Sequence, residues 1–115
     1  MFKAETSFDD SWISKVEHHY QQCLSKGNLK VKLIADHFSI SERQFHRKVK
    51  QYTDLTPNRF LQEMRLQKAK NMLLQSKAIT VKEVGYAIGF NNSRYFSNLF
   101  MKRFGIRPSK ISKLI

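Results

Sequence analysis

Two short stretches of the sequence, 43–50 and 93–102, are rich in side chains that donate hydrogen bonds. The first contains Arg43, Gln44, His46, Arg47 and Lys50, and the second contains Ser93, Arg94, Ser97, Asn98 and Lys102. Guanidinium, imidazole, amide and hydroxyl groups can hydrogen-bond the edges of nucleic-acid bases, and the cationic groups can neutralise phosphates. A helix that reads the major groove of DNA needs these residue types on its exposed face.

The net charge agrees with a polyanionic partner. The 115 residues include 21 Lys and Arg against 9 Asp and Glu, which gives a formal net charge of +12. Residues 1–28 have a net charge of −1, residues 29–75 of +6 and residues 76–115 of +7. Such a surplus suits nucleic acid or an acidic membrane surface. Its division into two basic blocks favours a binding function over lysines that merely keep the surface soluble.

Composition also excludes several classes of protein. The length fits one domain with a single hydrophobic core. The only cysteine, Cys23, cannot form an internal disulfide or a cysteine-based zinc site, and it falls on an apolar helix face, where we expect a core thiol. No apolar run approaches the roughly 18 residues of a membrane span, and the first residues lack the apolar stretch of a signal peptide. We therefore expect a cytoplasmic protein with no membrane partner.

An enzymatic function has little support in the sequence. The four histidines, at positions 18, 19, 37 and 46, do not show metal-ligand spacing with carboxylates. The sequence also lacks a phosphate-binding glycine loop and a nucleophile elbow. We expect no catalytic residue, no metal and no cofactor.

Helical periodicity and capping residues define the elements that must position the two polar stretches. Ser41 to Gln44 match the capping-box pattern, Thr80 can cap a further helix, and Pro57 suits a first helical turn. The expected helices span about 7–27, 31–38, 41–52, 57–75, 80–88 and 93–103, with a last short turn or helix from residue 108. No segment alternates with period two. The predicted fold class is all-α, with about seven helices in a single domain over residues 1–115.

An internal repeat organises these helices. Residues 29–40 align with residues 79–90 at an offset of 50, and the following residues align at an offset of 51. In each copy a small residue (Ala35 or Gly85) permits close helix approach, an apolar residue (Ile40 or Phe90) fills the turn, and an apolar pair forms a buried stripe. The pairs are Phe45 with Val49 and Phe96 with Phe100. We therefore predict two helix–turn–helix units, 29–52 and 79–103, joined by a linking helix at 57–75.

The length of the linking helix predicts the distance between the two recognition helices, at about 42–52 and 93–103. About 17 helical residues measure roughly 25 Å. With the width of the flanking units, the recognition helices can then lie about one DNA turn apart, roughly 34 Å. A monomer could thus read two successive major-groove segments on one face of the duplex.

Several motifs are specific enough to indicate a family. Ser41-x-Arg43-x-Phe45-x-Arg47 followed by Leu55-Thr56-Pro57-Asn58-Arg59-Phe60 resembles the first half of the AraC/XylS-type DNA-binding domain. Val84-Gly85-x-x-Ile88-Gly89-Phe90, then Ser93-Arg94-Tyr95-Phe96-Ser97 and Phe104-Gly105-x-x-Pro108-Ser109, is similar to its second half. The resemblance covers about residues 8–112. The residues at 44–48 and 57–60 are similar to those of the AraC/XylS-type domain found at the C-terminal end of two-component sensor–regulator hybrids.

The resemblance implies a bacterial transcription regulator that binds double-stranded DNA in a sequence-specific way, with RNA polymerase as a second candidate partner. It implies base contacts from the first recognition helix by Arg43, His46 and Arg47, and from the second by Ser93, Arg94, Ser97 and Asn98. The residues expected beside phosphates are Lys32, Gln44, Lys50, Lys82 and Lys102. The isolated domain is expected to be a monomer.

The sequence departs from the family pattern at a few positions. Asp54 stands where the first unit often has Gly, which predicts an Asp in a left-handed conformation. Asn98 stands where Arg is common, Met101 replaces a usual Lys, and Ile111-Ser112 replaces Tyr-Arg. These departures bear on the contacts of the second unit and on the last helix.

Two alternative binding functions have a physical basis. A basic amphipathic helix can bind a membrane surface, but here each basic helix uses its apolar stripe for the core of the repeat. RNA binding usually places bases on an aromatic platform, and no such motif occurs in the sequence. Duplex DNA is therefore the favoured partner.

Overall fold

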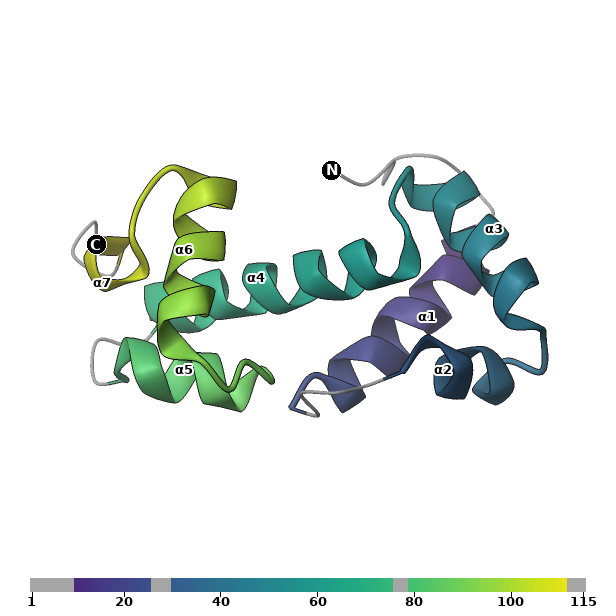
Figure 1. Ribbon diagram of the computed structural model, residues 1–115, viewed down its shortest axis with the longest axis horizontal. Coiled ribbons are helices and arrows are strands. Elements are labelled where there is room, and N and C mark those ends of the chain that lie inside the picture. The colour runs from purple at the N-terminus through teal and green to yellow at the C-terminus, as the bar shows by residue number, and fades with distance from the viewer. Residues whose placement is uncertain (1–9, 26–29, 76–78, 112–115) are drawn as a thin grey trace. The chain divides into compact units, whose positions relative to one another are not determined.

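The structure is a computed structural model that describes residues 10–25, 30–75 and 79–111. This part of the chain contains seven helices and no strand, which confirms the predicted all-α fold class (Figure 1). The helices are α1 (Asp10–Cys23), α2 (Val31–His37), α3 (Glu42–Thr53), α4 (Pro57–Gln75), α5 (Val81–Ala87), α6 (Ser93–Phe104) and α7 (Pro108–Ile111). Most bounds agree with the predicted ones to within a residue or two. The predicted ends of the first helix, at Ser7 and Gly27, lie outside the described residues.

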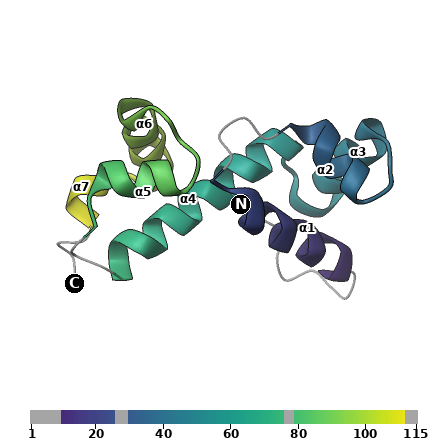
Figure 2. The same cartoon turned by 90° about the horizontal axis from the view of Figure 1, so that it is seen from below.

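The described residues form two compact units. Unit 1 contains α1, α2, α3 and α4 as far as Met64, and unit 2 contains α4 from Arg65, α5, α6 and α7, together with Leu24. In unit 1, α2 lies beside α3, and in unit 2, α5 lies beside α6 (Figures 1 and 2). Each unit thus contains one of the two helix pairs of the repeat.

Capping residues explain where the helices of each pair begin. The Ser41 hydroxyl accepts a hydrogen bond from the Gln44 backbone N–H at 3.1 Å, and the Gln44 side chain accepts one from the Ser41 N–H at 3.2 Å. Thr80 and Glu83 form the same reciprocal box at the start of α5. Because these bonds satisfy N–H groups that the helix itself leaves unpaired, they fix both starting points.

Residues in the left-handed conformation end or turn the helices at matching places in the two units. Asp54 ends α3 with φ +63°, as predicted, and Gly105 ends α6 with φ +74°. Ser39 and Gly89 lie in the two helix–turn–helix turns with φ +59° and +100°. The repeat therefore preserves backbone conformation at positions where the residue types differ, although left-handed geometry costs Ser and Asp more than Gly.

Buried aromatic and aliphatic side chains form a core in each unit, so the expectation of a single hydrophobic core was wrong. In unit 1 the Tyr20 ring packs on Phe60 with centroids 5.3 Å apart, and its hydroxyl donates to the Pro57 carbonyl at 3.3 Å. Burial raises the pKa of Tyr20 well above its ordinary value, so the hydroxyl keeps its proton for this bond. The core of unit 2 comprises Leu66, Ala69, Leu73, Val84, Ile88, Phe90, Phe96, Phe100 and Ile111. Ile111, which stands where the family pattern has Tyr, thus packs α7 against the core of unit 2.

Candidate nucleic-acid interface

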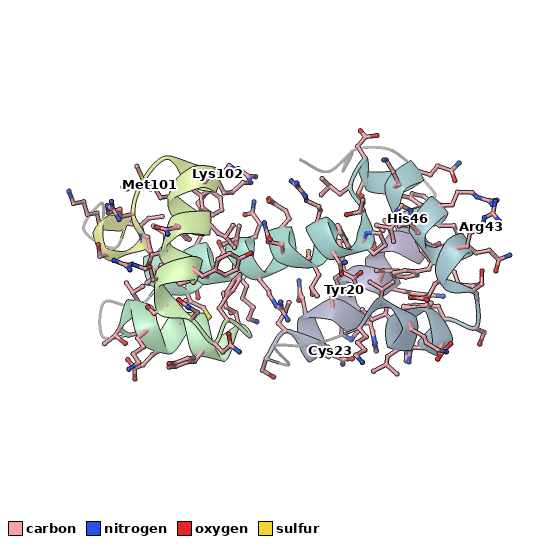
Figure 3. All side chains as sticks on the ribbon, viewed as in Figure 1. Tyr20, Cys23, Arg43, His46, Met101 and Lys102 are labelled. Carbon is pink, nitrogen blue, oxygen red and sulfur yellow. The ribbon has the colours of Figure 1, made fainter. Side chains whose placement is uncertain are left out.

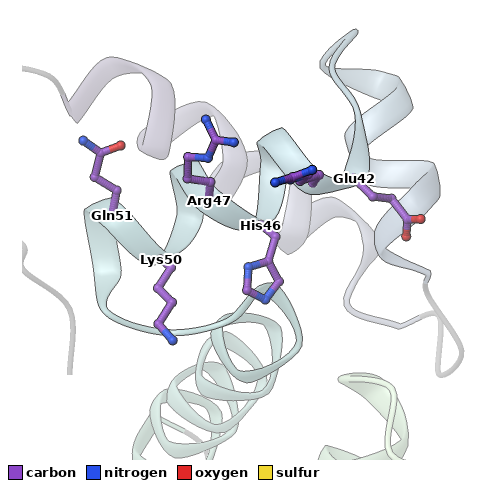
Figure 4. A pocket seen from close by; sticks show the side chains of 6 residues that line it. Glu42, His46, Arg47, Lys50 and Gln51 are labelled. Atoms are coloured by element: carbon purple, nitrogen blue, oxygen red, sulfur yellow. The ribbon is translucent and has the colours of Figure 1, made fainter.

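The two faces of α3 have opposite characters. Phe45 and Val49, four residues apart, are fully buried, as the predicted stripe requires. The side chains of Arg43, His46, Arg47 and Lys50 are exposed, and with Glu42 and Gln51 they line an open surface hollow. Figure 4 shows the side chains of His46, Arg47, Lys50 and Gln51 projecting from α3. An open, cationic helix face of this kind suits insertion into a groove and does not suit enclosure of a small molecule.

Gln44, a predicted phosphate contact, takes part in the structure of α3 itself. Its side-chain oxygen accepts the backbone N–H of Ser41 in the capping box. An acceptor held in this way stabilises the start of the helix. The side-chain NH2 group of Gln44 is therefore the group that would donate to a phosphate in the predicted contact.

The exposed face of α6 is less charged than that of α3. Phe96 and Phe100 are fully buried, which matches the buried pair of α3. Arg94, Asn98 and Lys102 are exposed, whereas Ser93 and Ser97 are half-buried. Two apolar side chains share the exposed face, because Tyr95 is 54% exposed and Met101 is 40% exposed. Figure 3 shows Met101 beside Lys102 near the end of α6.

Tyr95 is a candidate contact that the sequence prediction missed. Its ring meets Phe90 in an edge contact, with centroids 6.2 Å apart, and about half of the residue remains exposed. Aromatic and methyl groups on a recognition helix can contact the thymine methyl group. The sequence contained one sign of this exposure: Tyr95 directly precedes the expected buried residue Phe96 near the start of the helix, so it cannot share the same helix face.

Lys32 and Lys82 occupy equivalent places near the starts of α2 and α5, but their surroundings differ. The Lys32 ammonium lies 3.4 Å from Asp36 Oδ2, in an exposed i, i+4 pair. The Lys82 ammonium lies 5.9 Å from the ring centroid of Tyr86, also four residues on. Exposed ion pairs are weak, so Lys32 can leave Asp36 for a phosphate at small cost. The phosphate contacts expected of both lysines stay predictions.

His19, His37 and Cys23 lie close together, but their contacts are a ring stack and a weak hydrogen bond. The rings of His19 and His37 stack with centroids 4.0 Å apart, and Cys23 Sγ lies 3.8 Å from His19 Nε2. Among residues 10–25, 30–75 and 79–111, no group of three or more His, Cys, Asp or Glu side chains could hold a metal ion. Cys23 is buried, which agrees with the predicted core thiol.

In the described part of the chain, no helix is both long enough and apolar enough to cross a bilayer.

Comparison with known proteins identifies the family. The model of a helix-turn-helix domain matches residues 34–113. Over 78 residues the chain is 45% identical to the HTH-type transcriptional activator RhaS of Escherichia coli O9:H4 (strain HS), a match that covers 68% of this chain and 28% of RhaS. The chain thus spans under a third of the length of the curated relatives that it matches.

Solved structures of low sequence identity share the fold. The C-terminal domain of AraT, a response regulator from Geobacillus stearothermophilus, superposes with a TM-score of 0.79 at 22% identity, over 91% of this chain and 86% of that one. The DNA-binding domain of AdpA, solved in complex with a target DNA, gives 0.78 at 22% identity over 89% and 90%. A regulator with an AraC-type DNA-binding domain from Chromobacterium violaceum gives 0.73 at 25% identity over 90% and 95%. Sequence, fold and surface agree, and the chain belongs to the helix-turn-helix family as a DNA-binding domain of the AraC type.

Proposed function

We propose that this domain recognises a specific sequence in double-stranded DNA and thereby regulates transcription, with α3 in one major-groove segment and α6 in the next. The observation that carries the proposal is the division of α3 into a fully buried apolar pair, Phe45 and Val49, and an exposed cationic face. The same division recurs in α6 with Phe96 and Phe100. A helix that is anchored on one side in this way can present its other side to base edges.

The proposed base contacts follow from the exposed groups of each helix. Arg43 and Arg47 can each donate two hydrogen bonds to a guanine, and His46 can donate one to a purine N7. In α6, Arg94 and Asn98 are the exposed donors, and the half-buried hydroxyls of Ser93 and Ser97 lie on the same helix. The phosphate contacts that we propose are Lys32, Gln44, Lys50, Lys82 and Lys102.

The remaining parts of the proposal concern the whole regulator. Because the relative RhaS is a transcriptional activator, we include RNA polymerase as a second partner. The likeness to the C-terminal domain of a response regulator agrees with a two-component origin. We also propose that the isolated domain binds as a monomer and acts in the cytoplasm, where bacterial DNA is found.

A pair of arginine substitutions tests this function. Cognate duplexes are first selected from a random pool, and affinities of Arg43→Ala and Arg94→Ala are then measured on a cognate and a random duplex. Each substitution should cost about 1–3 kcal/mol on the cognate site, about 5- to 150-fold, with little change on random DNA.

Arg59→Ala is the matched control, because Arg59 is exposed but lies on α4. It removes the same charge and should leave the ratio of cognate to random affinity unchanged. Equal losses on both duplexes for Arg43→Ala and Arg94→Ala would mean that these arginines contact phosphate and would refute base reading.

A further inference from the structure

A cluster of aromatic rings connects α1 to the recognition helix of unit 1. Trp12 on α1 stacks on Tyr52 with ring centroids 5.8 Å apart and meets Phe45 edge-on at 5.8 Å. It also contacts Phe38, in the turn between α2 and α3, at 6.0 Å. Trp12 is therefore in contact with α3 over two helical turns, from residue 45 to residue 52.

Lys48 completes this cluster from the middle of the same stretch. Its ammonium lies 4.3 Å from the centroid of the Trp12 ring, well within the range of a cation–π contact. The Lys48 side chain is only half-buried, but its charged end turns toward α1. It is not among the residues that line the outward hollow of α3, where Arg47 and Lys50 lie.

Contacts over two turns restrict the rotation of α3 about its own axis. The tips of the exposed side chains of α3 lie roughly 6–8 Å from the helix axis, so a rotation of about 10–15° about that axis moves them by about 1–2 Å. Productive hydrogen bonds tolerate only about 0.5 Å or 10–20° of error. A contact that sets this rotation therefore affects base reading without touching DNA.

We propose that the Trp12–Lys48 pair is a positioning device for the recognition helix, and that Lys48, although basic and on that helix, does not neutralise a phosphate. The inference rests on the proposed function of α3. Lys48 is the one lysine of this helix whose described contact is with an aromatic ring of another helix. Specific binding should depend on this contact, and the salt dependence of binding should not.

The test compares Lys48→Met with the matched variant Lys50→Met, because both remove one charge from α3 and keep an unbranched stem. Affinity is measured as a function of salt on a random duplex and at one salt concentration on a selected cognate duplex. For Lys48→Met we expect an unchanged salt slope and a cognate-to-random ratio reduced about 5- to 10-fold. For Lys50→Met we expect the slope to fall by about one unit, with a smaller change in the ratio.

Two further measurements separate positioning from a general loss of structure. Lys48→Arg keeps a cation over the ring and should restore the cognate-to-random ratio, whereas Lys48→Gln should not. Trp12 is the only tryptophan in the chain, so its fluorescence reports on this contact directly. The emission should change in Lys48→Met and stay the same in Lys50→Met.

Two outcomes overturn the proposal. If Lys48→Met lowers the salt slope by about one unit and leaves the ratio unchanged, Lys48 contacts phosphate. If neither quantity changes, the pair does not position α3. A cognate-to-random ratio near one in the unsubstituted domain would instead refute the proposed function, and the salt slope of Lys48→Met would still decide whether Lys48 contacts phosphate.

Discussion

Gly89→Ala should be among the most destabilising single substitutions in unit 2. Gly89 has φ +100°, a conformation that costs an alanine about 1–2 kcal/mol. A Cβ atom placed there would overlap the backbone carbonyl oxygen of Leu24 and would lie 3.0 Å from a terminal nitrogen of Arg65. Because a backbone oxygen cannot rotate away, we add an overpacking cost of about 1–3 kcal/mol. Alanine also lowers the conformational entropy of the unfolded chain, which stabilises the folded state by about 0.4–1 kcal/mol.

The expected total is therefore a loss of about 1–5 kcal/mol, and a second glycine provides the control. Gly105 has φ +74°, but a Cβ atom there would meet nothing within 4 Å. Gly105→Ala thus carries the backbone cost alone and should lose about 1.5 kcal/mol or less. Both glycines belong to unit 2, so the two variants are compared on the same folding unit.

Urea unfolding followed by far-UV circular dichroism measures both free energies. The midpoint should fall further for Gly89→Ala than for Gly105→Ala, with similar m-values. If the two variants lose the same free energy, the overlap with Leu24 costs nothing. The reasoning from close approach would then be wrong.

Two further predictions concern the whole domain and one cap. A monomer should protect about 20 base pairs, roughly two turns of duplex, in a footprinting experiment, and protection of a single turn would contradict reading by both helices. Hydrogen bonds from the Thr80 backbone and side chain lower the pKa of Glu83, so this carboxylate stabilises the fold above its unfolded pKa and the contribution is lost as pH falls through the folded value. Thermal unfolding between pH 3 and 6 should show a flatter pH profile in Glu83→Gln; an unchanged profile would exclude the cap as a source of acid sensitivity.

Local sequence signals predicted the helices well. The capping box at Ser41, the cap at Thr80 and the first-turn Pro57 are local signals, because each involves only a few neighbouring residues at one helix start. The buried pairs of α3 and α6 also follow from spacing along one helix. Asp54 was predicted as left-handed because it stands where the first unit of the family pattern often has Gly, and its φ of +63° confirms this.

Contacts between helices could not be predicted in the same way. Trp12 and Lys48 are 36 positions apart, and only the packing of α1 on α3 brings them together. The stacking of His19 on His37 has the same origin. The 54% exposure of Tyr95 likewise depends on the packing of α6 in unit 2. The base contacts predicted for α3 and α6 remain predictions.

The buried pairs of α3 and α6 have a consequence for how such a domain can diversify. The helices α3 and α6 each contain a fully buried pair, Phe45 with Val49 and Phe96 with Phe100, and these residues do not coincide with any proposed DNA contact. Most substitutions at exposed positions change folding free energy by less than about 0.5 kcal/mol. Mutation can therefore explore new operator sequences at either helix without passing through misfolded intermediates. Under the proposed function, the DNA contacts of one helix can change while the other helix keeps the domain bound to DNA.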